Sequence, residues 1–263
     1  LEGEARAAGL LGAAVEAAAR LAASWMSAGF VHGVLNTDNL TITGESFDYG
    51  PWRFLPASDP HFTAAYFDEG GLYAFGRQPE AVSWALAQFG GALSLVCPVA
   101  LLEPHLKRYI DAYQNGLRDS MLARLHLAPS APEADLDVLQ DLFAWLTETQ
   151  VGWDQFFHDW VCGGASAGRA AASPQAAAYA RKDFAPIRAA LEARTPPDAA
   201  TFLSDPYWAR PTPVSLVIAE VEAVWAAIDE RDDWSLFEAK LADIDTLKRA
   251  LGAERHGPVA NAG

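Results

Sequence analysis

Residues 32–51 read HGVLNTDNLTITGESFDYGP, and they depart from the helical pattern that surrounds them. Most of these residues are short, β-branched or turn-forming, which is not typical of a helix interior. Leu40–Thr43 is predicted to be a short strand, Gly44 and Glu45 a tight turn, and Ser46 and Phe47 a second short strand. We therefore expect one β-hairpin, over about residues 40–47, as the only clear β element. A segment that departs from the pattern around it is typical of a functional site.

The chain outside this segment predicts a mainly α-helical fold. Apolar residues recur every three or four positions, as on one face of an amphipathic helix. The expected helices cover residues 1–30, 79–89, 101–127, 136–149, 153–161, 175–194, 214–229 and 234–251. The Gly/Ala/Ser-rich residues 162–174 are predicted to form a mobile loop, with Cys162 more exposed than Cys97. Residues 256–263 are predicted to be a frayed tail.

Composition and charge exclude several classes of protein. The 263 residues are 51% apolar and 20% charged, which excludes a disordered chain. Since 19 Lys and Arg stand against 34 Asp and Glu, the net charge is 19 − 34 = −15, and electrostatic binding to nucleic acid or anionic lipid is disfavoured. No apolar run approaches the roughly 20 residues of a membrane span. Two cysteines provide neither a disulfide framework nor a four-cysteine zinc site, so we expect a reducing compartment, the cytoplasm.

The polar residues of the segment suggest a magnesium site beside a proton acceptor. Asp38 and Asn39 precede the expected hairpin and Asp48 follows it, so that the hairpin brings them towards one another. Carboxylate and amide oxygens are ligands suited to Mg²⁺, which takes the rest of its shell from water and phosphates. A further carboxylate nearby can accept a proton from an attacking hydroxyl.

The same order of residues occurs in protein kinases, where an H-R-D-x-x-x-x-N loop is followed by D-F-G. His32 stands seven positions before Asn39, as in the kinase loop, and Asp48-Tyr49-Gly50 is similar to D-F-G. The kinase base would stand two positions after His32, where this chain has Val34. An ordinary Ser/Thr phosphotransferase is disfavoured for that reason.

The segment closely resembles the signature of the selenoprotein O family, which has HGVLNTDN followed by DYGP. The resemblance extends to residues on both sides, at 25–30, 52–55, 71–73 and 78–79. It implies a kinase-like fold that binds ATP flipped, transfers AMP to protein hydroxyls and releases pyrophosphate. It further implies that Asp38 is the proton acceptor, that Asn39 and Asp48 hold Mg²⁺, and that Asp48 contacts the nucleotide through the metal. His32 would organise the loop.

The resemblance also divides the chain and limits what it is expected to do alone. Residues 1–128 would be the kinase-like C-terminal lobe that carries both motifs, and residues 129–263 a helical extension packed on it. The Gly-rich loop, the strand lysine and its glutamate partner would all precede Leu1, so the nucleotide-binding lobe is expected to be absent from this chain. We therefore expect weak or no Mg-ATP binding by the chain in isolation.

Two functions remain as hypotheses. The first is the catalytic portion of a pseudokinase that uses ATP and Mg²⁺ to AMPylate Ser, Thr or Tyr hydroxyls of proteins. The alternative is a non-catalytic, kinase-like protein-interaction module. His158 with Asp154 and Asp159 could also suggest a metal site, but the aromatic residues among them favour a helix docked on the core.

Overall fold

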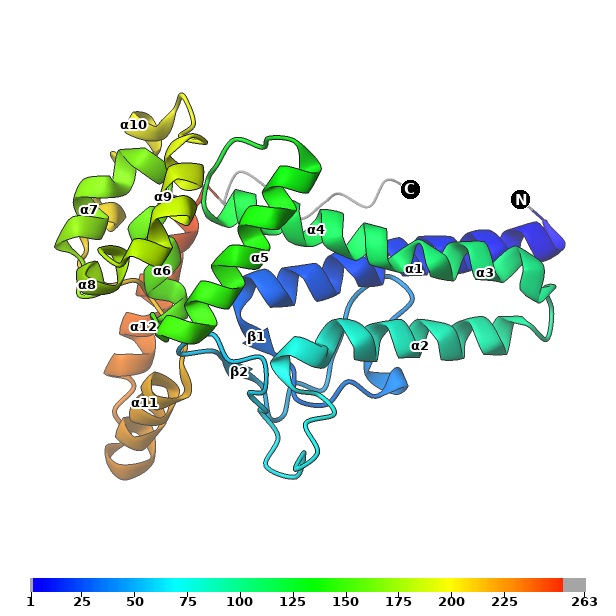
Figure 1. Ribbon diagram of the computed structural model, residues 1–263. Coiled ribbons are helices and arrows are strands. Elements are labelled where there is room, and N and C mark those ends of the chain that lie inside the picture. Colours follow the sequence, from blue (N-terminus) through cyan, green and yellow to red (C-terminus); the bar gives the residue numbers. More distant parts are fainter. Residues whose placement is uncertain (1, 253–263) are drawn as a thin grey trace. The chain divides into compact units, whose positions relative to one another are not determined.

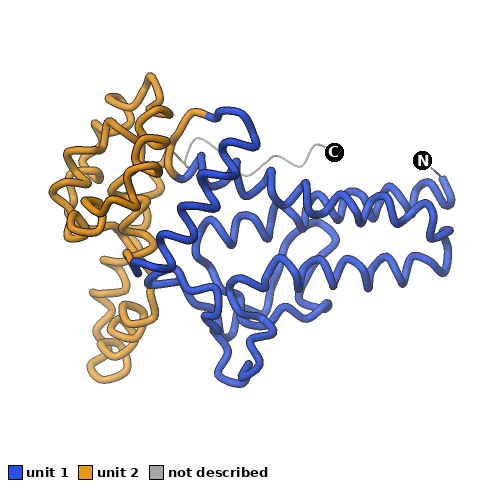
Figure 2. Tube along the Cα trace, viewed as in Figure 1, with its two compact units in different colours: residues 1–124, 129–150 blue, residues 125–128, 151–263 orange. Residues whose placement is uncertain are grey.

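The computed structural model describes residues 2–252 and is mainly helical, as predicted (Figure 1). The chain forms two compact units (Figure 2). The first runs to Arg124 and includes Pro129–Gln150, and the second consists of Leu125–Ala128 and the chain from Val151 onward. Pro129–Gln150, which follows the boundary expected at 128/129, belongs to the first unit. The predicted tail, 256–263, lies outside the described residues.

The first unit is built on helices with two very short strands. Its elements are α1 (Gly3–Ala28), β1 (Phe30–Val31), the 3₁₀ turn η1 (Thr37–Asn39), β2 (Arg53–Phe54), the 3₁₀ turn η2 (Phe75–Arg77), α2 (Gln78–Leu93), α3 (Val99–Lys107), α4 (Tyr109–Arg124) and α5 (Pro132–Thr149).

Helix α1 is the centre of this unit because its small and apolar residues let other helices approach closely. α2, α3 and α4 all contact it (Figure 1). Its buried residues include Leu11, Val15 and Trp25, which form one core with residues of α2 and α3. By length and composition α1 could cross a membrane, yet half of its most apolar window is buried inside the unit. It is therefore packed as the core helix of a globular unit.

The β structure differs from the single hairpin that the sequence predicts. β1 and β2 pair antiparallel, with Phe30 opposite Phe54 and Val31 opposite Arg53. The expected strands at 40–47 are reduced to one isolated bridge between Leu40 and Ser46. The prediction of one hairpin over 40–47 is therefore wrong in extent. The regular strand pairing lies instead at the two ends of the loop, where Phe30 and Val31 pair with Phe54 and Arg53.

The second unit is a set of short helices. Its elements are α6 (Trp153–Trp160), η3 (Gly163–Ser166), α7 (Ala167–Ala172), α8 (Ala176–Tyr179), η4 (Lys182–Phe184), α9 (Ala185–Glu192), α10 (Ala199–Phe202), η5 (Pro206–Ala209), α11 (Ile218–Arg231) and α12 (Ser235–Ala250). Helix α6 is buried on most of its surface, and residues next to it, among them Val161 and Cys162, pack against Tyr207 and Trp208.

Residues 162–174 do not form the predicted loop, since most of them are helical. Cys162 is fully buried, so the prediction that it is the more exposed cysteine is also wrong, and Cys97 is buried too. A Cβ added at Gly163 would lie 2.3 Å from the carbonyl oxygen of Leu191. The glycine there permits close packing against α9 rather than mobility, which composition alone does not distinguish.

Candidate functional site

The segment 32–51 is a loop whose two ends are tied together in the core of the first unit. β1 leads into it and β2 leads out, and the N–H of Leu55 donates to the carbonyl of Gly29 at 2.9 Å. Gln78, at the start of α2, is fully buried and reinforces this closure. Its amide donates to the carbonyl of Phe30 at 2.9 Å, and its side-chain oxygen accepts the N–H of His32 at 2.9 Å. One glutamine thus fixes the start of the loop.

His32 lies inside the loop and organises it. Its ring is fully buried among Trp25, Phe30 and Tyr49. Nε2 lies 3.2 Å from the carbonyl of Phe47, and Nδ1 accepts the N–H of Val34 at 3.4 Å. This pattern suits a neutral imidazole that is protonated at Nε2. Burial lowers the pKa of His32, although the Phe47 carbonyl and Asp48 act in the opposite direction. The geometry matches the organising role that the resemblance implies.

The middle of the loop is folded back tightly on itself and on α1. The N–H of Phe47 donates to the carbonyl of Asn39 at 3.3 Å, and the N–H of Thr41 donates to the carbonyl of Glu45 at 2.9 Å. Gly44 has φ 79°, and a Cβ there would lie 2.6 Å from the Cβ of Ala17. Only glycine fits this turn without displacing α1.

The fold-back brings Asn39 and the start of the Asp48 motif together. The backbone hydrogen bond from Phe47 to Asn39 places Asp48, the residue after Phe47, close to the backbone of Asn39. Asp48 has φ 62°, a left-handed conformation that turns the chain away from the bridge. Asn39 is buried, and its amide group donates to the carbonyl of Val34 at 2.9 Å. Its Oδ1 accepts no hydrogen bond within residues 2–252, so it remains available as a ligand.

Asp38 and Asp48 are exposed carboxylates without protein partners. Neither makes a hydrogen bond or an ion pair with any residue that the structure describes. Asp38 is the middle residue of η1, next to Asn39. Two acidic groups left unpaired on a loop that is otherwise closed by hydrogen bonds are unusual for a purely structural turn, in which Asp caps backbone N–H groups.

Asp38 lines a pocket of about 580 Å³ that the metal candidates do not line. One wall comes from Asn36, Thr37 and Asp38, and the other comes from residues between Leu72 and Trp84. The hydroxyl of Tyr73 donates to Oδ1 of Asn36 at 2.6 Å and joins the two walls. Burial, together with Asp68 and Asp38, raises the pKa of Tyr73, so that its hydroxyl stays a neutral donor.

The oxygen groups of Asn39 and Asp48 are of the kind that Mg²⁺ prefers. No group of three His, Cys, Asp or Glu side chains that could hold a metal occurs in the described part of the chain. Asn39 and Asp48 contribute one amide oxygen and one carboxylate, which are hard oxygen ligands. Such a pair suits Mg²⁺, which keeps several waters and binds phosphates, and does not suit a metal that needs a full protein cage.

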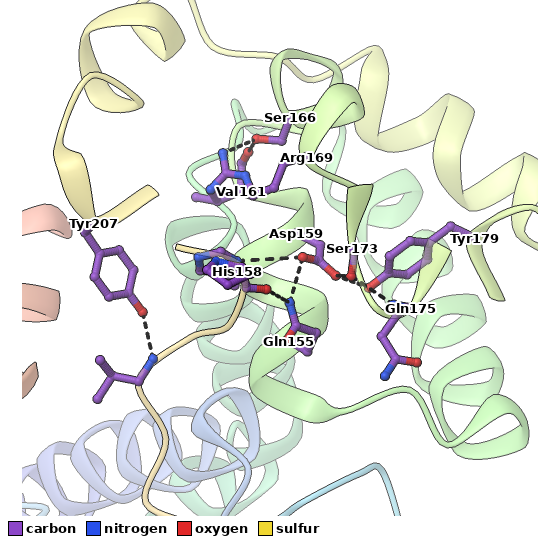
Figure 3. A network of polar contacts seen from close by, with 12 residues as sticks. Gln155, His158, Asp159, Val161, Ser166, Arg169, Ser173, Gln175, Tyr179 and Tyr207 are labelled. Atoms are coloured by element: carbon purple, nitrogen blue, oxygen red, sulfur yellow. Dashed lines mark hydrogen bonds and ion pairs between the residues drawn. The ribbon is translucent and has the colours of Figure 1, made fainter. Parts of the chain in front are cut away.

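A second cluster of polar residues lies in the second unit, and its carboxylate, Asp159, uses both oxygens in internal hydrogen bonds (Figure 3). Asp159 on α6 accepts from Gln155 at 2.8 Å, from Ser173 at 2.5 Å and from Tyr179 at 2.8 Å. His158 lies 3.7 Å from Asp159 and packs against Tyr207 and Trp208. This arrangement agrees with the interpretation of α6 as a helix docked on the core and not as a metal site.

Two residues that position the loop were given no role from the sequence. Gln78 and Tyr73 contact the loop from positions 46 and 37 residues away from their partners. The only signal was that both lie in stretches that carry the family resemblance. Their partners could not be read from local patterning.

Comparisons with known proteins identify the same family that the sequence of the loop resembles. The family model described as protein adenylyltransferase SelO matches residues 2–245. A protein nucleotidyltransferase YdiU of Gloeobacter violaceus is 40% identical over 228 residues, which cover 83% of this chain and 46% of the relative. Proteins of the same name from Trichodesmium erythraeum and Myxococcus xanthus are 46% and 41% identical, over 54% of this chain and 30% and 29% of their own lengths.

The chain thus spans less than half the length of these relatives. The match to the family model nevertheless covers both units and includes the whole segment 32–51. With the bridged loop, its buried histidine and its free carboxylates in view, the chain belongs to the protein adenylyltransferase SelO family.

Proposed function

We propose that this chain is the catalytic portion of a Mg²⁺-dependent enzyme that transfers AMP from ATP to Ser, Thr or Tyr hydroxyls of proteins. The observation that carries the proposal is the free carboxylate of Asp38, which lines a pocket next to Asn39 in a loop fixed by buried hydrogen bonds. The nucleotidyltransferase names of the relatives support the reaction class. In this proposal the first unit corresponds to the C-terminal lobe of a kinase-like fold.

Asp38 is assigned the role of proton acceptor. The oxygen of the acceptor hydroxyl bonds to the α-phosphorus of ATP, and the bond from that phosphorus to the bridging oxygen of the β-phosphate breaks. Pyrophosphate leaves with the electron pair, and the hydroxyl proton passes to the Asp38 carboxylate. An exposed carboxylate with no competing donor suits this task, because nothing else occupies its lone pairs.

Asn39 and Asp48 are assigned to the metal. Oδ1 of Asn39 and the carboxylate of Asp48 would hold Mg²⁺, which supplies charge neutralisation at the phosphates when bound. The backbone bond between Phe47 and Asn39 keeps the two ligands near each other without help from the nucleotide.

His32 and Gln78 position these groups without touching the substrate. His32 ties the Phe47 carbonyl, one residue before Asp48, to the start of the loop. Gln78 in turn ties His32 to α2. Fixing the reacting groups before the substrates bind removes part of the entropic barrier to the transfer.

The test measures transfer of AMP from α-labelled ATP to a generic acceptor protein. It uses the 263-residue chain and, in parallel, a polypeptide in which the nucleotide-binding lobe implied by the family precedes it. The extended polypeptide is expected to label Ser, Thr or Tyr, and Asp38→Ala is expected to reduce labelling by about 10²–10⁴-fold. Asp137→Ala removes an exposed carboxylate on α5 and serves as the matched control, with unchanged labelling. Transfer of the γ-phosphate, or no transfer by the extended polypeptide, would refute the proposal.

A further inference from the structure

We propose that the pocket beside Asp38 binds an extended segment of the acceptor protein, which presents an apolar side chain next to the hydroxyl and carries basic residues around it. We call it the acceptor pocket, and Asn36, Asp38, Leu72, Tyr73, Arg77 and Trp84 are among the residues that line it. This inference rests on the proposed function and adds the chemistry of the acceptor.

The wall of the acceptor pocket opposite Asp38, formed by residues between Leu72 and Trp84, is held in place by hydrogen bonds within the protein. The two carboxylate oxygens of Asp68 accept the N–H groups of Leu72 and Tyr73, at 2.7 and 2.8 Å. Arg77 donates to Glu80 at 3.0 Å and to the carbonyl of Gly71 at 3.3 Å. Together with the bond from Tyr73 to Asn36, these contacts hold both walls without a ligand, as is usual for a binding site.

The position of the pocket favours the acceptor over the nucleotide. Asp38 lines it, whereas Asn39 and Asp48, the assigned metal ligands, do not. ATP must reach the metal ligands, and the hydroxyl must come within about 3 Å of the base. A ligand that fills this pocket therefore meets the base and not the metal.

The charge of the lining agrees with that choice. Arg77 is the one cation of the lining residues and is paired with Glu80, so that Asp38 leaves the pocket with a net negative charge. A triphosphate would find no free cation there. Lysine or arginine residues flanking the hydroxyl would be attracted, since the lining and the chain, with its net charge of −15, are acidic.

The apolar part of the lining sets the preference for an apolar neighbour. The side chains of Trp84 and Leu72 remain 57% and 51% exposed, although both are large and apolar. Exposed tryptophan beside a pocket is typical of a residue that becomes buried when a partner docks. An aliphatic or aromatic side chain next to the acceptor hydroxyl would cover it.

The binding experiment uses the 263-residue chain and a fluorescein-labelled peptide in which a serine lies between leucine and phenylalanine and is flanked by lysines. Fluorescence anisotropy should show binding that Trp84→Ala weakens by about 10-fold. Trp225→Ala is the matched control, because this tryptophan of α11 is 62% exposed and lies outside the pocket. A peptide with glutamates in place of the lysines should bind about 10-fold more weakly, and this difference should shrink as salt is added.

Several outcomes would overturn the inference: no binding of the lysine peptide, equal binding by the unmutated chain and Trp84→Ala, or equal losses for Trp84→Ala and Trp225→Ala. Displacement of the peptide by ATP alone, with ATP affinity lowered by Trp84→Ala, would make the pocket a nucleotide site instead.

Transfer assays separate this inference from the proposed function. In the extended polypeptide, Trp84→Ala should raise KM for the acceptor peptide about 10-fold and leave KM for ATP unchanged. Transfer that depends on Asp38 but not on Trp84 would refute the acceptor pocket and leave the proposed function intact. Peptide binding that depends on Trp84, with no AMP transfer to any hydroxyl, would refute the proposed function and the acceptor assignment with it.

Discussion

Asp38 in the first unit and Asp159 in the second are carboxylates that experience opposite surroundings. Asp38 is exposed and makes no hydrogen bond with a described residue, whereas Asp159 is 1% exposed and accepts hydrogen bonds from three side chains. Each lies after a histidine that packs among aromatic rings: Asp159 directly follows His158, and Asp38 lies six residues after His32. A preceding histidine among aromatic rings therefore does not by itself distinguish an unpaired carboxylate from a buried, hydrogen-bonded one.

The two carboxylates differ in whether their oxygens accept hydrogen bonds from the protein. Asp159 uses its oxygens to join α6 to Ser173 and Tyr179, so its contribution is to the stability of the second unit. Asp38 leaves its oxygens free beside a pocket, so its removal should affect chemistry and not folding. The predictions below change one site or the other, and they start with the largest expected effect.

Asp159→Ala should lower the free energy of unfolding of the second unit by about 3 kcal/mol, because three donors lose a buried acceptor. Urea denaturation followed by tryptophan fluorescence measures this change. Asp38→Ala is the control and should change the free energy of unfolding by less than about 0.5 kcal/mol. Similar losses for both variants would erase the contrast between the two sites.

Gln78→Leu should lower the free energy of unfolding of the first unit by about 2 kcal/mol, since it leaves the carbonyl of Phe30 and the N–H of His32 unpaired in the core. Hydrogen exchange should show faster exchange of the amides in segment 32–51. Gln88→Leu, at an exposed position of the same helix, is the control. Unchanged exchange in the segment would mean that Gln78 does not fix the loop.

His32 should make the first unit less stable at mildly acidic pH. Burial lowers its pKa in the folded state, so below its ordinary value of about 6.5 the unfolded chain binds more protons than the folded one. The free energy of unfolding then falls as the pH drops from about 6.5 towards that lowered pKa. Urea titrations at pH 7 and at pH 5.5 should show the loss, and His32→Gln should reduce it. An equal loss in the variant would assign it to other groups.

The sequence predicted much of the frame of the site but few of its long-range contacts. The apolar period of α1 and the change of pattern at His32 located the helix and the loop, because both are local properties. The predicted hairpin is too long. The β-branched residues at 40–43 favour a strand, but the turn at Gly44 packs closely against Ala17 of α1, and only Leu40 and Ser46 form a bridge. The contacts of Gln78 and Tyr73 join residues far apart in the chain, which no local pattern encodes.

The central claim is that Asp38 acts on the acceptor and Asp48 acts on the metal. The most direct test measures Mg²⁺-dependent ATP binding by calorimetry, together with AMP transfer, for Asp38→Ala and Asp48→Ala in the extended polypeptide. The account predicts that Asp48→Ala loses both, while Asp38→Ala keeps ATP affinity and loses transfer by about 10²–10⁴-fold. Loss of ATP binding by Asp38→Ala to the same extent as by Asp48→Ala, or transfer by Asp38→Ala at the unmutated rate, would contradict it.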